Sequence, residues 1–170
     1  MSITVVVGNP RAGSRTLGVA TAVGRRVASE LGEGDPQVVD LATLGPALLE
    51  YGQPDVAAAL RHVLDARVTV FASPTYKASF TGLLKLLLDQ IGAGDLTNRV
   101  GIPLMTGGAP IHALSVEVHL RPVLVELGAS VPSPGLYVLE SQFEDLDAVI
   151  GGWWETAGPS VRRLAGTAGD

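Results

Sequence analysis

The sequence predicts an α/β domain built on a parallel five-stranded β-sheet, doubly wound, with helices on both faces. Short runs of β-branched and apolar residues alternate along the chain with longer segments of helical periodicity. The strand runs are apolar at nearly every position, as expected for a parallel sheet that is covered on both sides. No linker, repeat or low-complexity segment divides the 170 residues, so one domain over residues 1–170 is expected.

The first half of the chain contains three predicted strands and two predicted helices. In chain order they are a strand at residues 3–8, a helix at 16–31, a strand at 37–41, a helix at 55–66 and a strand at 68–73. The β-branched runs indicate the strands. Gly32, Gly34 and Pro36 end the first helix, since glycine and proline interrupt helical segments.

The second half continues the alternation, with two prolines that conflict with it. The predicted elements are a helix at residues 80–91, a strand at 100–106, a helix at 111–127, a strand at 130–139 and a weaker helix at 142–164. Pro103 lies inside a strand and removes a hydrogen-bond donor, so a bulge or early fraying is expected there. Pro122 lies inside a helix and predicts either a kink or a wider turn around residues 117–121.

Composition excludes several classes of function. The net charge is −5 and the basic residues are scattered, so nucleic acid is not an expected partner. The absence of cysteine removes disulfides, thiol nucleophiles and cysteine-bound metals. His62 and His119 stand apart from any carboxylate cluster, so no metal site is expected.

Location and assembly follow from the apolar residues. No run approaches the roughly 20 apolar residues that span a bilayer, and the N-terminus enters a strand without a signal-peptide pattern. A cytoplasmic protein is therefore expected. The segment "GLLKLLLDQI" is apolar on nearly every face, which predicts a homodimer or homotetramer with an interface through residues 80–91 and 111–127.

The stretch "GNPRAGSRT", residues 8–16, has the pattern of a phosphate-binding turn between a strand and a helix. A P-loop would need Lys and a hydroxyl residue after Gly13, but Ser14 and Arg15 stand there. The dinucleotide pattern G-x-G-x-x-G is also absent from Gly8. A loop that wraps one terminal phosphate, as in flavodoxins, remains, and the alternative is a capped turn with solvated arginines.

Two further strand ends favour the phosphate-binding interpretation. Ligands of open α/β sheets lie beyond the carboxyl ends of the strands. The segments "SPTYKASFTG" (73–82) and "TGGAP" (106–110) follow the predicted strands at 68–73 and 100–106, so both fall at that edge.

These segments resemble the NAD(P)H-dependent FMN reductases, particularly those of alkanesulfonate monooxygenase systems. The matching pieces are "GNPRAGSRT", "ASPTYKASFTGLLKLLLD", "VGIPLMTGGAPIHAL" and "LRPVLVELGA", in order from residue 5 to about 142. The resemblance implies a flavodoxin-like fold with strand order 2-1-3-4-5. The family also has a wide, π-type turn with an aromatic residue, where this chain has Val118 and His119.

The resemblance implies an FMN site at the three strand ends. The phosphate would be held by the first loop, in which the family usually has Ser at the Asn9 position. The second loop would run along the isoalloxazine, largely through backbone amides, and the third would let the backbone approach the flat ring. The implied cofactor-binding residues are Asn9, Arg11, Ser14, Arg15, Thr16, Pro74, Thr75, Tyr76, Lys77, Thr106, Gly107, Gly108 and His112.

Three of these residues have alternative roles. Tyr76 either stacks on the flavin or packs against the base of the next helix. Lys77 either steers the nicotinamide nucleotide or is a solvated loop cation. His112 either lies near the flavin or makes a hydrogen bond at a helix start.

The implied activity is reduction of FMN by NADPH or NADH, by hydride transfer to flavin N5, with FMNH2 supplied to a partner monooxygenase. No catalytic acid or base is required, because the cofactor supplies the chemistry. The alternatives are a reductase that keeps FMN bound and reduces quinones, azo dyes or metal ions, and an electron carrier of the flavodoxin type without enzymatic activity.

Overall fold

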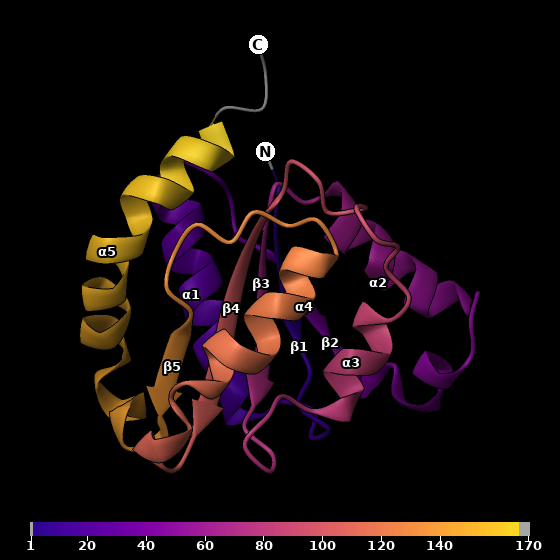
Figure 1. Cartoon of the computed structure of the whole chain (residues 1–170), viewed down its shortest axis with the longest axis horizontal. Helices are drawn as coiled ribbons and strands as arrows, with labels where there is room; N and C mark the ends of the chain where they lie inside the picture. The colour runs from indigo at the N-terminus through magenta and orange to yellow at the C-terminus, as the bar shows by residue number, and fades with distance from the viewer. Residues whose placement is uncertain (1, 167–170) are drawn as a thin grey trace.

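A five-stranded parallel sheet forms the centre of the molecule in the computed structural model, which describes residues 2–166 (Figure 1). The strand order is β2-β1-β3-β4-β5, as the resemblance implies. The strands are β1 (Ile3–Val7), β2 (Gln37–Asp40), β3 (Val68–Pro74), β4 (Val100–Gly107) and β5 (Leu136–Leu139). Their carboxyl ends meet at one edge, at the bottom of Figure 1.

Helices cover both faces of the sheet, as the sequence predicts. The helices α1 (Arg15–Leu31) and α5 (Leu146–Gly166) lie on one face. The helices α2 (Pro54–Asp65), α3 (Gly82–Leu88) and α4 (Arg121–Glu126) lie on the other. Within residues 2–166, no helix combines the length and apolar character that crossing a membrane requires.

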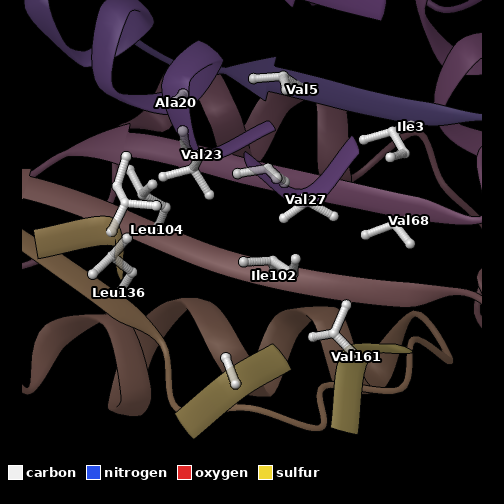
Figure 2. Close-up of a cluster of buried hydrophobic side chains, with 14 of the residues drawn as sticks. Ile3, Val5, Ala20, Val23, Val27, Val68, Ile102, Leu104, Leu136 and Val161 are labelled. Carbon is white, nitrogen blue, oxygen red and sulfur yellow. The ribbon is translucent and has the colours of Figure 1, made fainter. Parts of the chain in front are cut away.

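Alternation along the strands divides the apolar side chains between two cores. Val5 and Val7 pack toward α1 and α5, whereas Val6 packs toward the opposite helices. Figure 2 shows the first core, where Val23 and Val27 of α1 meet aliphatic side chains of the central strands. Each central strand therefore buries both faces, which is why its sequence is apolar throughout.

Pro103 causes no bulge, so that expectation is wrong. The β4 strand pairs with β3 without interruption from Val100 to Thr106. The backbone N–H of Gly101 donates to Ser130 on the β5 side at 2.9 Å, and alternation turns the nitrogen of Pro103 to the same side. Regular pairing with β5 begins only at Leu104, so Pro103 faces a part of the chain where no ladder bond is formed.

Pro122 coincides with a wider turn, one of the two outcomes expected from its position. Residues Val116–Leu120 form a single π-helical turn directly before α4, and the N–H of Arg121 donates to the carbonyl of Val116. Pro122 is then the second residue of α4, where its missing N–H costs little. The predicted helix at 111–127 is thus divided, with a separate 3₁₀ turn at Pro110–His112 before the π turn.

Glu117 and Arg121 anchor this π turn to the chain that leads into β5. Arg121 pairs with the Glu117 carboxylate and donates to the carbonyls of Val131 and Ser133. The N–H of Gly135 donates to Glu117. The hydrogen bond from Arg121 holds the pKa of Glu117 below its ordinary value, although partial burial opposes this shift.

Two predicted elements are shorter in the structure. The predicted helix at 80–91 retains only the seven residues of α3, and its leucines pack against two 3₁₀ turns, Leu41–Thr43 and Gly45–Leu49, that the sequence did not reveal. The predicted strand at 130–139 is reduced to β5 and a single bridge at Ser130, because Pro132, Pro134 and Gly135 interrupt it.

Candidate functional site

A cleft of about 600 Å³ lies at the carboxyl ends of β1, β3 and β4, where the sequence predicts a ligand. It brings together all of the predicted site residues except Lys77 and His112. Its lining is Asn9, Arg11, Ala12, Gly13, Ser14, Arg15, Thr16, Pro74, Thr75, Tyr76, Thr106, Gly107, Gly108, Glu140 and Phe143. Four segments that lie far apart in the sequence therefore form one site.

The N-terminus of α1 opens into this cleft and attracts anions. Ser14 is the N-cap, and its hydroxyl oxygen accepts from the N–H of Leu17 at 3.2 Å. The backbone N–H groups of Ser14, Arg15 and Thr16 have no protein acceptor within residues 2–166. The first turn contains no acidic residue. Unpaired N–H groups and the positive end of the helix dipole together make a site for a phosphate.

A buried polar network holds the loop before α1 in place. The Asn9 side-chain amide donates to the hydroxyl of Thr16 at 3.2 Å, and the Thr16 hydroxyl lies 2.9 Å from the hydroxyl of Thr106. The Asn9 carbonyl oxygen accepts from the N–H of Arg11 at 2.9 Å. Thr16 and Thr106 are almost fully buried. These side chains thus connect the first loop to the end of β4, under the cleft.

The two arginines of the loop differ in their surroundings. Arg11 is exposed, and its guanidinium makes no hydrogen bond or ion pair with any other part of residues 2–166. Arg15 pairs with the Glu140 carboxylate at 2.8 Å and lies 5.3 Å from the centre of the Phe143 ring. Arg11 is therefore the cation that an anion in the cleft can engage without breaking another contact.

The loop after β3 has most of its amides occupied. The N–H of Thr75 donates to the carbonyl of Thr106 at 2.7 Å. Tyr76 and Ser79 exchange two hydrogen bonds across a tight turn, in which Lys77 and Ala78 have positive φ angles of 51° and 64°. Since Pro74 has no N–H, Lys77 carries the one backbone N–H of residues 74–77 that has no acceptor within residues 2–166.

Tyr76, Lys77 and His112 lie differently relative to the cleft. Tyr76 lines the cleft and is 52% exposed, as expected of a residue that borders a ligand. Lys77 is exposed at the tip of the turn and does not line the cleft. His112 ends the 3₁₀ turn Pro110–His112 and does not line the cleft either.

Glycine is favoured at position 107 because a tyrosine hydroxyl takes the space beside it. A Cβ atom at Gly107 would lie 2.1 Å from the Tyr137 hydroxyl, whereas a Cβ at Gly108 would meet nothing within 4 Å. Tyr137 donates to the carbonyl of Ala109 at 3.0 Å. The Thr75 hydroxyl is buried nearby without a partner in the described chain. Tyr137 thus supports the Gly107–Gly108 turn from below.

The sequence prediction missed Ala12, Gly13, Glu140 and Phe143. Ala12 and Gly13 lie inside the quoted loop and follow from it directly. Glu140 and Phe143 follow β5, so the rule that places ligands at the carboxyl ends of strands would also have indicated this segment.

Comparisons with known proteins agree on one family. The family model described as NADPH-dependent FMN reductase matches residues 1–144. The chain is 33% identical over 150 residues to the NADH-dependent FMN reductase SfnF of Pseudomonas putida. This alignment covers 84% of this chain and 79% of that protein. It is 32% identical over 151 residues to an FMN reductase (NADPH) of Pseudomonas aeruginosa, with coverage of 84% and 79%.

A solved structure extends the likeness over the whole chain. The apo form of the NADH:FMN oxidoreductase EMOB superposes with a TM-score of 0.80 at 28% identity, covering 99% of this chain and 90% of that one. The sheet order, the cleft at the strand ends and the match over residues 1–144 lead to the same conclusion. The chain belongs to the NADPH-dependent FMN reductase family.

Proposed function

We propose that this protein reduces FMN with NADPH or NADH and releases FMNH2 to a partner monooxygenase. The observation that carries the proposal is the cleft at the strand ends, which is lined by the N-terminus of α1, by Arg11, unpaired within residues 2–166, and by a glycine turn. The names of the relatives agree with FMN as the flavin, but they differ over the nicotinamide nucleotide.

The described residues fit FMN at both ends of the cleft. The N–H groups of Ser14, Arg15 and Thr16, with the guanidinium of Arg11, supply donors and positive charge for a phosphate dianion. The Gly107–Gly108 turn and the side chain of Tyr76 would border the flat ring system. When bound, FMN would supply the redox chemistry, by accepting a hydride at N5 from the nicotinamide.

The protein's own contribution is binding, orientation and shielding. Backbone N–H groups at a helix terminus hold charge without rearranging, and the buried network of Asn9, Thr16 and Thr106 fixes their direction. Glu140 is the only carboxylate among the residues that line the cleft, and it is paired with Arg15. The proposed reaction therefore assigns no proton transfer to a side chain.

Supply of FMNH2 to a second enzyme requires that FMN leave the protein after each turnover. The open phosphate end, where Arg11 and Arg15 are both largely exposed, supports exchange of the flavin. We also propose that the protein works in the cytoplasm as one domain over residues 1–170, although residues 1 and 167–170 lie outside the described chain.

The test is oxidation of NADPH and NADH, followed by absorbance, with FMN, FAD and riboflavin offered separately to the purified protein. We expect a colourless protein whose activity depends on added FMN, and transfer of the product to an added FMNH2-dependent monooxygenase. Tightly bound FMN with rapid reduction of quinones would instead support the reductase that retains its flavin. Firm FMN binding without reduction by either nucleotide would support the electron carrier.

A further inference from the structure

Glu140 and Phe143 reach the cleft from the segment after β5 and hold Arg15 from two sides. The Glu140 carboxylate lies 2.8 Å from the Arg15 guanidinium, and the Phe143 ring lies 5.3 Å from it. Both side chains line the same cleft as the α1 N-terminus. The phosphate site therefore contains a carboxylate that engages one of its two cations.

We propose that Glu140 weakens the binding of flavin phosphates by holding Arg15, and that this keeps FMN exchangeable. This inference rests on the proposed function, because it assumes that the phosphate lies at the α1 N-terminus. It assigns to Glu140 a role in tuning affinity, and to Phe143 a role in keeping Arg15 on the β5 side of the cleft.

Charge in the cleft supports this role. The charged side chains of the lining are Arg11, Arg15 and Glu140, which leaves one net positive charge. A phosphate monoester carries nearly two negative charges at neutral pH. Without the Glu140 charge, two arginines would face the dianion. The carboxylate therefore opposes the phosphate electrostatically and competes with it for Arg15.

The position of Arg15 makes this competition direct. Arg15 is the first residue of α1, where the positive end of the helix dipole disfavours a cation unless an anion lies near. In this structure Glu140 supplies that anion, and the cation–π contact with Phe143 adds to it. A phosphate at the same helix terminus would be a second anion for the same guanidinium.

The experiment measures dissociation constants of FMN and riboflavin for the wild-type protein and for Glu140→Gln, by quenching of flavin fluorescence. The Arg15–Glu140 pair is largely exposed, so we expect FMN to bind about two- to five-fold more tightly in the variant. Riboflavin, which lacks the phosphate, is expected to bind equally to both. Dissociation of FMN, followed by stopped flow, is expected to slow by a similar factor.

Two further variants make the result specific. In an Arg15→Gln background, the gain in FMN affinity from Glu140→Gln is expected to shrink, because the competition for Arg15 is gone and only the screened repulsion between the carboxylate and the phosphate remains. Glu30→Gln removes the same charge at the other end of α1, where Glu30 pairs with Arg26 and Arg162. We expect no change in FMN affinity from this control.

Each other outcome contradicts the proposal. Weaker FMN binding by Glu140→Gln would mean that Glu140 presents Arg15 to the phosphate. A gain of undiminished size in the Arg15→Gln background would mean that competition for Arg15 is not involved. Failure of the proposed function is separate, because it would show as equal affinity of the wild-type protein for FMN and riboflavin, whatever Glu140→Gln does.

Discussion

Arg11 and Arg15 belong to the same short stretch at the phosphate site, residues 8–16, yet their contacts give them different roles. Arg11 has no partner elsewhere in residues 2–166, whereas Arg15 is shared with Glu140 and Phe143. A guanidinium that gives up no existing contact keeps the full value of a charge-assisted hydrogen bond to phosphate. The affinity for the phosphate should therefore depend mainly on Arg11.

Arg11→Ala is expected to weaken FMN binding by about tenfold or more, since a hydrogen bond to a charged group is worth roughly 1.5–3 kcal/mol. Riboflavin binding should hardly change. The measurement is a titration of both flavins against the wild-type and variant proteins. Equal losses for FMN and riboflavin would contradict the assignment of Arg11 to the phosphate.

Gly107 and Tyr137 form a second pair whose roles can be separated by substitution. Gly107→Ala should destabilise the fold by about 1–3 kcal/mol, because its Cβ would overlap the Tyr137 hydroxyl at 2.1 Å. Tyr137→Phe removes that hydroxyl, so the double variant should regain part of the loss. Urea unfolding of the two single variants and the double variant tests this. Strictly additive losses would show that the hydroxyl is not the obstacle.

At the scale of elements, the π turn before α4 is stabilised by a half-buried ion pair. Glu117 accepts from Arg121 and from the N–H of Gly135, and Arg121 also donates to two carbonyls of the segment that precedes β5. These contacts fasten an irregular turn to an irregular connection. The ion pair therefore stabilises a region that lacks the regular backbone hydrogen bonds of the other elements.

Glu117→Gln is expected to reduce the free energy of unfolding at pH 7 by about 1 kcal/mol. Arg121 lowers the pKa of Glu117 in the folded protein, so the carboxylate stabilises the fold above the pKa of the unfolded chain, about 4.3. As the pH falls through the folded pKa, this contribution is lost. The difference between wild type and variant should be constant from pH 7 to about 5 and shrink at lower pH in urea unfolding. If wild type and variant differed by the same free energy of unfolding at every pH, the ionised form of Glu117 would not be the stabilising one.

Elements whose signals are local could be predicted from the sequence. The loop at residues 8–16 and the Gly107–Gly108 turn carry their own patterns, and both line the cleft. Glu140 and Phe143 carry no such pattern, and only the general rule that ligands lie at the carboxyl ends of strands points to their segment beside β4. Likewise, the effect of Pro103 depends on where β5 begins to pair, which the residues around Pro103 do not encode.

For the whole molecule, the exposed apolar side chains indicate where the subunit interface of the predicted oligomer would lie. The surplus of apolar residues in α3 is covered within the chain by the turns at Leu41–Thr43 and Gly45–Leu49. Ile111, Leu114 and Val118 remain 82%, 70% and 58% exposed. We propose that a homodimer or homotetramer forms through this part of residues 111–127, because such a patch is costly in water.

Leu114→Glu is expected to shift the assembly to monomers in light scattering at micromolar concentration, because it places a charge in the proposed apolar contact. Leu49→Glu is the matched control, since Leu49 is 68% exposed but lies outside the predicted interface segments, residues 80–91 and 111–127. A wild-type protein that is monomeric at this concentration would contradict the proposed assembly. If Leu49→Glu but not Leu114→Glu produced monomers, the subunit interface would lie near Leu49 rather than at residues 111–127.

The tight turn at residues 76–79 is a place where a substitution should raise the stability of the fold. Lys77 and Ala78 both occupy left-handed backbone conformations, which glycine adopts without steric cost. Ala78→Gly should therefore raise the stability by roughly 0.5–1 kcal/mol after the entropy of the unfolded chain is counted, measured as a higher melting temperature. Ala78 does not line the cleft, so the change should leave flavin affinity intact. An engineer who needs a more robust catalyst can begin at this position without redesigning the site.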